Sequence, residues 1–361
     1  MSTRGGTGAG GPRRAHPSLI LLLGLALAAA ALTGCGHHGH DDPAAEIDDW
    51  WRPTADRPLE LQWVLGGSLD RRDPTDMGRV DLAGGRQRDP DVYDLDGDAT
   101  PRSTVAALHA HHKTVICSFD AGVYESSRPD AKAFQALKPR IWGRAGAQGG
   151  PGGSSPADAS WLDIRRVHEL EPIMKARIDQ CRRKGFDAVE PQEIDGYAHG
   201  TGFPLTAEDQ LRYDRALARW AHEAGLSIGQ KGDIDQAEDL WPSFDWALDE
   251  GCYQDHECAK LDPYIVANKA VWIAEYPEET RPHGGRWPAS AVRRIHRKAG
   301  DAYVLTSAVA ARLCRDAAEH RFNLVQFRLG LPEGPAGGRR QCHTLKARKP
   351  LITKIRPPAN P

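Results

Sequence analysis

The chain has 361 residues, 40% of them hydrophobic and 27% charged, which excludes a wholly disordered, collagen-like or coiled-coil protein. Its 47 basic and 49 acidic side chains give a formal net charge of -2, so there is no overall basic field to hold nucleic acid, and we expect no such partner. The length fits two average domains, or one α/β barrel of about 250 residues with extensions.

Residues 1–34 have the pattern of an export signal. Three arginines precede an uninterrupted apolar run at 19–32. This run of about 14 residues is shorter than the ~20 residues of a transmembrane helix, which favours a signal peptide over a permanent membrane span.

The string Leu32-Thr33-Gly34-Cys35 resembles a bacterial lipobox, in which the cysteine thiol accepts a lipid. We therefore expect lipidation of Cys35 and a location outside the cytoplasm, with the lipid anchoring the protein to the bacterial cell membrane. The alternative is an ordinary cleaved signal with Cys35 near the cleavage site, which would give a secreted protein.

Composition divides the remainder into three parts. Residues 35–49 are polar and lack apolar periodicity, which predicts a flexible tether. Residues 346–361 mix basic residues with proline and predict a disordered tail. Residues 50–345 then form a single folded domain.

Of the 7 cysteines, six follow Cys35, an even number that is compatible with disulfides outside the cytoplasm. Cys252 and Cys258 are the most favourable local pair because a short loop separates them, and Cys314 and Cys342 are a second candidate pair. The sequence leaves the full connectivity open.

Short β-rich runs alternate with helix-length amphipathic stretches in this domain. The alternation predicts βα units around a parallel sheet, and the expected fold class is a (β/α)8 TIM barrel. Nine candidate strands compete for eight barrel places: 59–64, 92–94, 114–119, 161–164, 186–190, 226–230, 245–248, 271–275 and 323–327. The predicted helices are 104–112, 167–184, 207–224 with Thr206 as its N-cap, and 291–298.

Carboxylates follow most of the predicted strands. Because the carboxyl ends of barrel strands share the face where such enzymes build their active sites, these acids are better candidates than acids on helix exteriors. Two positioned carboxyl groups can cleave an acetal, one protonating the leaving oxygen while the other attacks or activates water. The pattern predicts glycoside hydrolysis at an acidic face formed by Asp94, Asp96, Asp120, Glu125, Glu190, Glu193, Asp249, Glu250 and Glu275.

Eight segments between Glu60 and Tyr276 match one family pattern in order and spacing. They are VYDLD (92–96), VICSFDAGVYE (115–125), RPDA (128–131), WLDIR (161–165), KGFDAVEPQEIDGY (184–197), GFPLTAEDQLRY (202–213), AHEAGLSIGQK (221–231) and DEGC (249–252). With them the chain resembles the endo-α-1,4-polygalactosaminidases, glycoside hydrolase family 114. The resemblance implies a TIM-barrel domain and hydrolysis of α-1,4-linked galactosamine polymers, which are cationic when their amines are free.

The resemblance implies an acid/base role for Glu250, the glutamate before the cysteine in DEGC. Its expected partner is the acid after a VEP-like tripeptide, where the family reads EPDN and this chain reads Glu190-Pro191-Gln192-Glu193. Gln192 cannot act as a carboxylate, so the second catalytic acid must come from elsewhere. Glu193 is the nearest replacement, and Asp120 adds an acid where the family has serine.

The remaining matched positions are candidate substrate-binding residues. For Asp195 and Tyr197 a structural role in the loop after the strand is the alternative. An acidic face would attract a cationic polysaccharide, which is the expected partner, and we expect no cofactor and no metal. The candidate substrate-binding set is Asp96, Glu190, Gln192, Asp195, Tyr197, Lys231 and Glu275.

Two other functions remain open at this point. A non-catalytic polysaccharide-binding lipoprotein would keep the acidic cleft but lack turnover, because Gln192 replaces an acid. Deacetylation of the same polymer by a metal site would need histidines and aspartates at strand ends, whereas His109, His111 and His112 lie near a predicted helix end.

Overall fold

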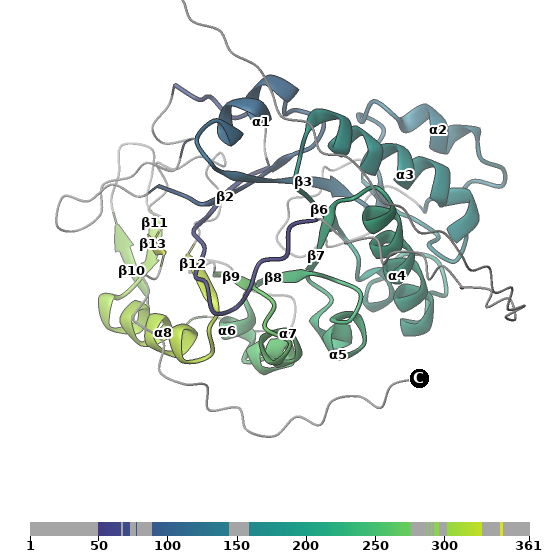
Figure 1. Cartoon of the computed structure of the whole chain (residues 1–361). Helices are drawn as coiled ribbons and strands as arrows, with labels where there is room; N and C mark the ends of the chain where they lie inside the picture. The colour runs from purple at the N-terminus through teal and green to yellow at the C-terminus, as the bar shows by residue number, and fades with distance from the viewer. Residues whose placement is uncertain are drawn as a thin grey trace, which may run out of the picture. The chain divides into compact units, whose positions relative to one another are not determined.

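The computed structural model describes residues 50–65, 68–72, 77, 89–143, 159–275, 287, 290, 292–295, 302–326 and 340–341. Eight strands, joined by seven parallel pairings in chain order, curve into a barrel with helices outside it (Figure 1). The barrel strands are β1 (Leu61–Val64), β2 (Val92–Asp96), β3 (Thr114–Asp120), β6 (Ala188–Gln192), β7 (Ser227–Lys231), β8 (Trp246–Glu250), β9 (Val271–Glu275) and β12 (Asn323–Gln326). This confirms the predicted TIM-barrel class.

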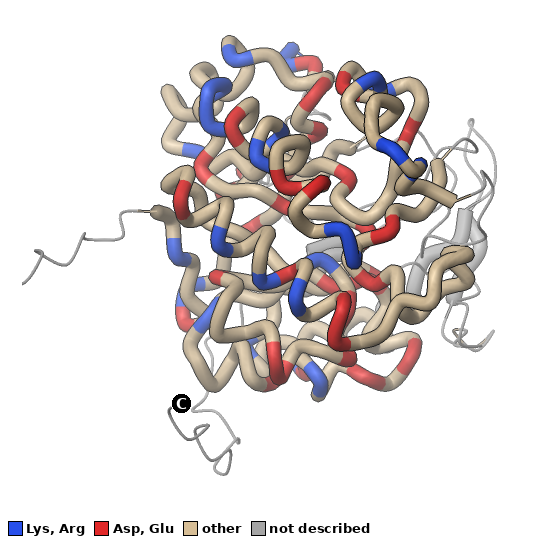
Figure 2. The backbone as a smooth tube through the Cα atoms, turned by 90° about the vertical axis from the view of Figure 1, so that its right-hand side faces the viewer, with Lys and Arg blue, Asp and Glu red and all other residues tan. Residues whose placement is uncertain are grey.

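The helices follow the strands as a βα pattern requires. They are α1 (Arg102–His109), α2 (Ala131–Ala136), α3 (Val167–Lys184), α4 (Ala207–Glu223), α5 (Ala237–Leu240), α6 (Cys252–Asp255), α7 (Asp262–Val266) and α8 (Ser307–Glu319), with 3-10 turns η1 (Gly196–Ala198), η2 (Ile234–Gln236) and η3 (Cys258–Leu261). The predicted start of α4 is confirmed, because Thr206 and Asp209 form a reciprocal capping box. Basic and acidic residues are intermixed along the backbone in the view of Figure 2, and neither sign covers the whole face.

Eight of the nine predicted strands occupy the eight barrel places. The ninth, at 161–164, lies outside the barrel: only β5 (Ser160–Trp161) is a strand, and it pairs antiparallel with β4 (Val123–Tyr124). The segment between β3 and α3 therefore contains a small two-stranded antiparallel sheet of its own.

The helix predicted at 291–298 is wrong. Val292–Ile295 forms strand β10 and pairs antiparallel with β11 (Ala302–Leu305). The β-branched ends of VRRI favour a strand once AYVL supplies a pairing partner. Another antiparallel strand, β13 (Arg340–Gln341), pairs with β12. Helix α8 was not predicted, and Thr306 caps it by accepting a hydrogen bond from the Val309 amide.

At the amino ends of the strands, the interior of the barrel is packed with large apolar side chains. The Trp246 and Trp272 rings meet edge to face at 5.5 Å, and Trp51 packs against both at 6.2 Å. A Cβ at Gly229 would lie 2.2 Å from the Trp246 ring, so β7 needs glycine at that position. The seam between β12 and β1 is bridged by the Asn323 side chain, which accepts a hydrogen bond from the Leu59 amide at 3.1 Å.

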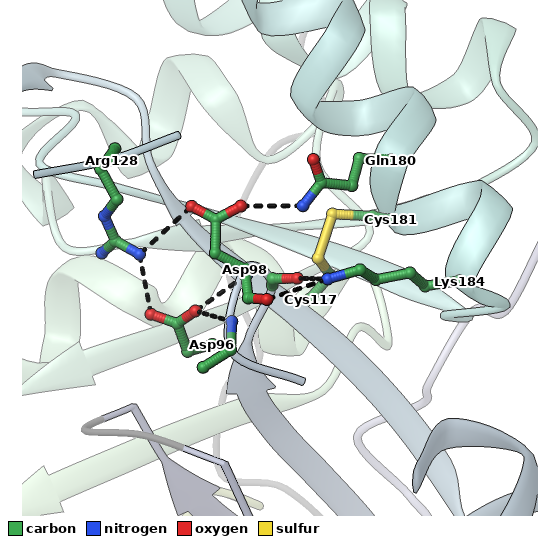
Figure 3. Close-up of a disulfide and its surroundings, with 9 residues drawn as sticks. Asp96, Asp98, Cys117, Arg128, Gln180, Cys181 and Lys184 are labelled. Carbon is green, nitrogen blue, oxygen red and sulfur yellow. Dashed lines mark hydrogen bonds and ion pairs between the residues drawn. A yellow bond between two sulfur atoms is a disulfide. The ribbon is translucent and has the colours of Figure 1, made fainter. Parts of the chain in front are cut away.

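Two disulfides are described. Cys252–Cys258 confirms the predicted local pair, and Cys117–Cys181 ties β3 to α3 across 64 residues (Figure 3). Cys314 is also disulfide-bonded, and Cys35 and Cys342 lie outside the described residues.

The predicted signal peptide, the tether at 35–49 and the tail at 346–361 lie outside the described residues, as does the lipidation site at Cys35. In the part of the chain that is described, no helix combines the length and the apolar character needed to cross a membrane.

Candidate active site

The inner face of the barrel changes character along the strands. Near their amino ends the strands contribute apolar side chains, whereas alternate positions further along carry polar ones on the same face. These polar side chains lie at the carboxyl ends, where barrel enzymes build their active sites. They are Asp94 and Asp96 from β2, Ser118 and Asp120 from β3, Glu190 and Gln192 from β6, Lys231 from β7 and Glu250 from β8.

Glu250 forms an ion pair with Lys231 on the neighbouring strand. Lys231 Nζ contacts Glu250 Oε1, and the two side chains are only 9% and 13% exposed. The ammonium also lies 5.0 Å from the ring centroid of Trp63, a cation–π contact. Burial would lower the pKa of Lys231, but the charges of Glu250 and Glu190 outweigh it and raise that pKa, so Lys231 is the charged counter-ion of Glu250.

Gln192 lies in the interior beside Glu190. Its Nε2 donates hydrogen bonds to Ser118 Oγ at 2.6 Å and to Glu190 Oε1 at 2.7 Å. Both N–H groups of the Gln192 side chain are therefore used in these two hydrogen bonds, and its carbonyl oxygen is the remaining polar atom of the side chain.

Glu190 is fully buried beneath the ion pair. Burial raises the pKa of its carboxyl to about 7; Lys231 and a hydrogen bond with Asp94 lower it, and the Glu250 charge raises it. Glu190 therefore keeps its proton to a higher pH than an ordinary glutamate does.

Asp120 and Gln192 end adjacent strands and are register partners. The acid that this chain has in place of a family serine thus lies one strand away from the position where the family's acid is missing. Asp120 Oδ2 accepts a hydrogen bond from Arg128 Nη2 at 2.8 Å.

Arg128 links four carboxylates at the rim of the barrel. Besides Asp120, it donates to Glu125 Oε2 from Nε at 2.6 Å and to Asp96 Oδ2 from Nη1 at 2.9 Å, and Asp98 lies at 3.5 Å. Burial would lower the pKa of Arg128, but Asp120, Glu125 and Asp96 together raise it. Sequence reasoning did not single out this arginine, although it opens the matched segment RPDA and follows Glu125 by three residues.

The turn after β2 holds Asp96 in place. Asp96 Oδ1 accepts hydrogen bonds from the Asp98 and Ala99 amides at 2.8 and 2.7 Å, so both of its carboxylate oxygens have partners. Gln180 and Lys184 of α3 bind the same turn, next to the Cys117–Cys181 disulfide (Figure 3). A Cβ at residue 97 would lie 2.5 Å from Cys117 Sγ, so the turn packs directly on the disulfide and needs Gly97.

Glu193 lies just beyond the end of β6. Its backbone is in the left-handed region with φ 59°, and a Cβ at Gly122 would lie 1.6 Å from its carbonyl oxygen. Its charge acts on His199, which pairs with Asp195 at 2.8 Å and stacks on Trp161. The left-handed backbone at Glu193 thus follows the end of β6 directly, and this acid lies in the loop that carries the Asp195–His199 pair.

Asp195 and Tyr197 belong to a buried acid cluster next to the barrel mouth. Tyr197 is hydrogen-bonded to Asp233, and Asp214 Oδ1 accepts a hydrogen bond from Gln210 Nε2 at 2.8 Å. Burial and the charges of Asp214 and Asp195 raise the pKa of Asp233 to about 10, although Tyr197 lowers it. Sequence reasoning missed Asp214 and Asp233, because one lies mid-helix and the other in a left-handed turn.

Glu275 is placed apart from the other candidates. On β9, Trp272 packs in the barrel interior, so Glu275, three positions on, faces the helix layer. Its Oε1 accepts a hydrogen bond from the Tyr253 amide at 2.9 Å. This carboxylate therefore supports the loop that carries Cys252–Cys258.

The described residues contain no group of three or more His, Cys, Asp or Glu side chains arranged to hold a metal ion. The inner face instead carries carboxylates from β2, β3, β6 and β8, of which Glu250 is paired with Lys231 and Asp120 with Arg128. Such an arrangement can transfer protons, stabilise developing positive charge and bind cationic groups.

Comparison with known proteins identifies the family. A model of glycoside-hydrolase family GH114 matches residues 40–320. Among solved structures the chain is similar to Ega3 of Aspergillus fumigatus in complex with galactosamine, with 25% identity, a TM-score of 0.60, and coverage of 81% of this chain and 97% of Ega3. It is also similar to the glycoside hydrolase domain of PelA from Pseudomonas aeruginosa, with 13% identity, a TM-score of 0.47, and coverage of 78% and 98%.

Among curated proteins none matches significantly. The family match spans more than half of the chain and confirms the resemblance seen in its sequence. The chain therefore belongs to glycoside-hydrolase family GH114.

Proposed function

We propose that this protein is an exported hydrolase of α-1,4-linked galactosamine polymers that uses Glu250 and Asp120 as its two carboxyl groups. Membership of GH114 and the likeness to Ega3, solved with galactosamine, support the reaction and the substrate class. The observation that carries the choice of Asp120 is its register pairing with Gln192. A carboxyl displaced by one strand still faces the interior, whereas Glu193 lies beyond the end of β6 on a left-handed backbone.

The charge of the site supports a cationic substrate. The carboxylates of Asp96, Asp98 and Asp120 surround one guanidinium, that of Arg128, so negative charges outnumber the cation at this rim. Coulomb attraction to a hexosammonium group is strengthened where water is partly excluded. A polymer with free amines would therefore bind better than its fully acetylated form.

The two carboxyl groups divide the chemistry. Asp120, which accepts a hydrogen bond from Arg128, attacks the anomeric carbon or activates the water that does so. Glu250 gives its own carboxyl proton to the leaving oxygen, and the carboxylate that remains is stabilised by Lys231, whose ammonium contacts Glu250 Oε1. Gln192 binds water or a sugar hydroxyl through its carbonyl oxygen.

The rival function is a polysaccharide-binding protein without turnover. The amide at Gln192, where the family has an acid, is the observation that favours it. Both proposals share the same cleft and the same cationic ligand, so only product formation separates them.

The lipid anchor at Cys35 and the extracytoplasmic location are further parts of the proposal. The lipobox-like sequence supports them, and so do the disulfides, which persist mainly outside the cytoplasm. Incorporation of a fatty-acid analogue by wild type but not by Cys35→Ala is the expected result. Equal labelling of both would contradict lipidation at this cysteine.

Release of reducing ends from partly deacetylated α-1,4-galactosaminogalactan tests the hydrolase. We expect release by wild type, loss of about 10³-fold or more in Glu250→Gln, and little change in Glu223→Gln, an exposed glutamate paired with Lys175. Binding of the polymer without products, and an effect of Glu250→Gln on affinity alone, would establish the rival.

A further inference from the structure

We propose that Glu125 acts in its protonated form as a positioning residue, which donates a hydrogen bond to Asp120 and, with Arg128, fixes that carboxylate in the site. This inference rests on the proposed function, in which Asp120 is the second catalytic carboxyl. It assigns to Glu125 a proton that must be retained for the site to keep its geometry.

Glu125 is buried beside Asp120, and Arg128 binds both carboxyl groups. Glu125 follows β4, and its side chain is 2% exposed. One oxygen, Oε2, accepts a hydrogen bond from Arg128 Nε at 2.6 Å, and the carboxyl is also hydrogen-bonded to Asp120. Because a carboxylate can only accept, the contact between Glu125 and Asp120 needs a proton on one of them.

The proton belongs to Glu125 rather than to Asp120. Burial, the hydrogen bond with Asp120 and the negative charge of Asp120 together raise the pKa of Glu125 to about 8, and Arg128 only partly opposes them. Asp120 has additional donors: Arg128 Nη2 binds its carboxylate, and Arg177 Nη1 contacts its backbone oxygen. Its negative charge is thus better compensated.

The surrounding charges agree with this assignment. Carboxylates from two strands and their turns outnumber the guanidinium groups that reach them, so one neutral carboxyl relieves repulsion. The charged groups around the Glu125–Asp120 pair are Asp96 at the end of β2, Asp98 in the turn after it, Arg128 and Asp130 in the loop before α2, and Arg177 on α3. The Tyr213 hydroxyl of α4 also lies nearby and donates a hydrogen bond to the Ala121 carbonyl oxygen.

Loss of this proton has a direct consequence for Asp120. An ionised Glu125 donates no hydrogen bond, and it places a second negative charge against the Asp120 carboxylate. We expect Asp120 to leave its position, so that turnover falls as pH rises through the titration of Glu125.

Carboxyl NMR tests the proton independently of activity. In the full-length protein labelled with carboxyl-13C glutamate, we expect one glutamate to titrate near about pH 8, to disappear in Glu125→Gln, and to move down by about one pH unit or more in Asp120→Ser, which removes the neighbouring charge. Glu223→Gln should leave that signal in place. A Glu125 signal that titrates below about pH 5, or one that Asp120→Ser does not move, would overturn the proposal.

Activity tests the positioning role. Glu125→Gln keeps a neutral donor, so it should stay within about threefold of wild type near neutral pH and lose the alkaline decline, whereas Glu125→Ala should lower kcat by about 10-fold or more with little change in KM. The substrate amines titrate in the same range, so wild type and Glu125→Gln are compared on one substrate. An unchanged alkaline decline in Glu125→Gln would refute positioning.

The two failures are distinguishable. If wild type releases no reducing ends, the proposed function fails, and the NMR titration still decides whether Glu125 holds a proton against Asp120. If wild type is active and the titration is absent, this inference alone fails.

Discussion

Asp120 at the end of β3 and Gln192 at the end of β6 are register partners, with both side chains on the inner face of the barrel. In the GH114 pattern the acid stands at the position of Gln192, and in this chain an acid stands at its neighbour. Moving a carboxyl by one strand shifts it by about 5 Å, a distance that a bound saccharide can span. This relationship is the reason why we propose Asp120 as the second carboxyl group of the site.

Removing the ammonium of Lys231 is expected to impair both stability and turnover. Lys231→Gln leaves Glu250 without its buried counter-ion, so we expect a loss of about 3 kcal/mol in the free energy of unfolding and of about 10²-fold in kcat. Urea unfolding and initial rates measure the two effects. The matched control is Lys175→Gln, whose partner Glu223 is exposed, and it should cost less than about 1 kcal/mol. Equal effects of the two substitutions would contradict the role of Lys231.

Stability is expected to be highest at mildly acidic pH. Glu125, Glu190 and Asp233 have pKa values raised to about 8, about 7 and about 10, so the folded protein retains protons that the unfolded chain has released above its ordinary carboxyl pKa values of 4.5 and 3.8. Stability therefore falls as pH rises through this window. The pKa of His199 is also raised, so the stability that its charged form contributes is likewise lost as pH rises.

The melting temperature measures this pH dependence. We expect it to be several degrees higher near about pH 5.5 than near about pH 8.5. Burial raises the pKa of Asp214 well above its usual range, so Asp214→Asn, which is neutral at every pH, should flatten the decline. A melting temperature that rises between these two pH values would contradict the assignment.

Binding of a cationic polymer is expected to weaken with salt. Screening reduces the attraction between the acidic rim and hexosammonium groups, so KM for a deacetylated polymer should rise several-fold between about 0.05 and 0.5 M salt, with little change in kcat. The fully acetylated polymer, which carries no amine charge, is the control. The same salt dependence for both polymers would show that charge does not select the substrate.

Each disulfide is expected to stabilise the folded protein, and the one that closes the longer loop is expected to stabilise it more. Loop-closure entropy gives about 4 kcal/mol for Cys117–Cys181, which closes 64 residues, and about 2 kcal/mol for Cys252–Cys258, which closes 6. Urea unfolding of the two double serine variants measures the difference. A larger loss for Cys252–Cys258 would show that native contacts held by that bridge, rather than chain entropy, dominate.

The barrel itself was predictable from the sequence. Eight runs of β-branched and apolar residues alternate with amphipathic helices, and the capping box before α4 and the short Cys252–Cys258 loop leave local signatures. The predictions fail where a distant pairing partner determines the secondary structure. VRRI has the pattern of a helix but forms a strand because it pairs with AYVL, and the strand at 160–161 forms because it pairs with β4.

The site was predictable in composition but not in arrangement. Strand parity places Glu250, Glu190 and Asp120 inside, yet the sequence gives no sign that Arg128 joins Asp96 to Asp120. That link depends on a loop folding back over the barrel mouth. The direction of Glu193 depends likewise on a left-handed backbone that a one-dimensional pattern does not encode.

An exchange of the two site residues tests whether Asp120 supplies the second catalytic carboxyl. Reducing-end release is measured for wild type, for Asp120→Ser and for Asp120→Ser combined with Gln192→Asp, which restores the family arrangement. The account expects Asp120→Ser to lose about 10²-fold or more in kcat and the double variant to regain most of that loss. Full activity in Asp120→Ser would contradict the account, because Glu250 would then be working without the carboxyl assigned as its partner.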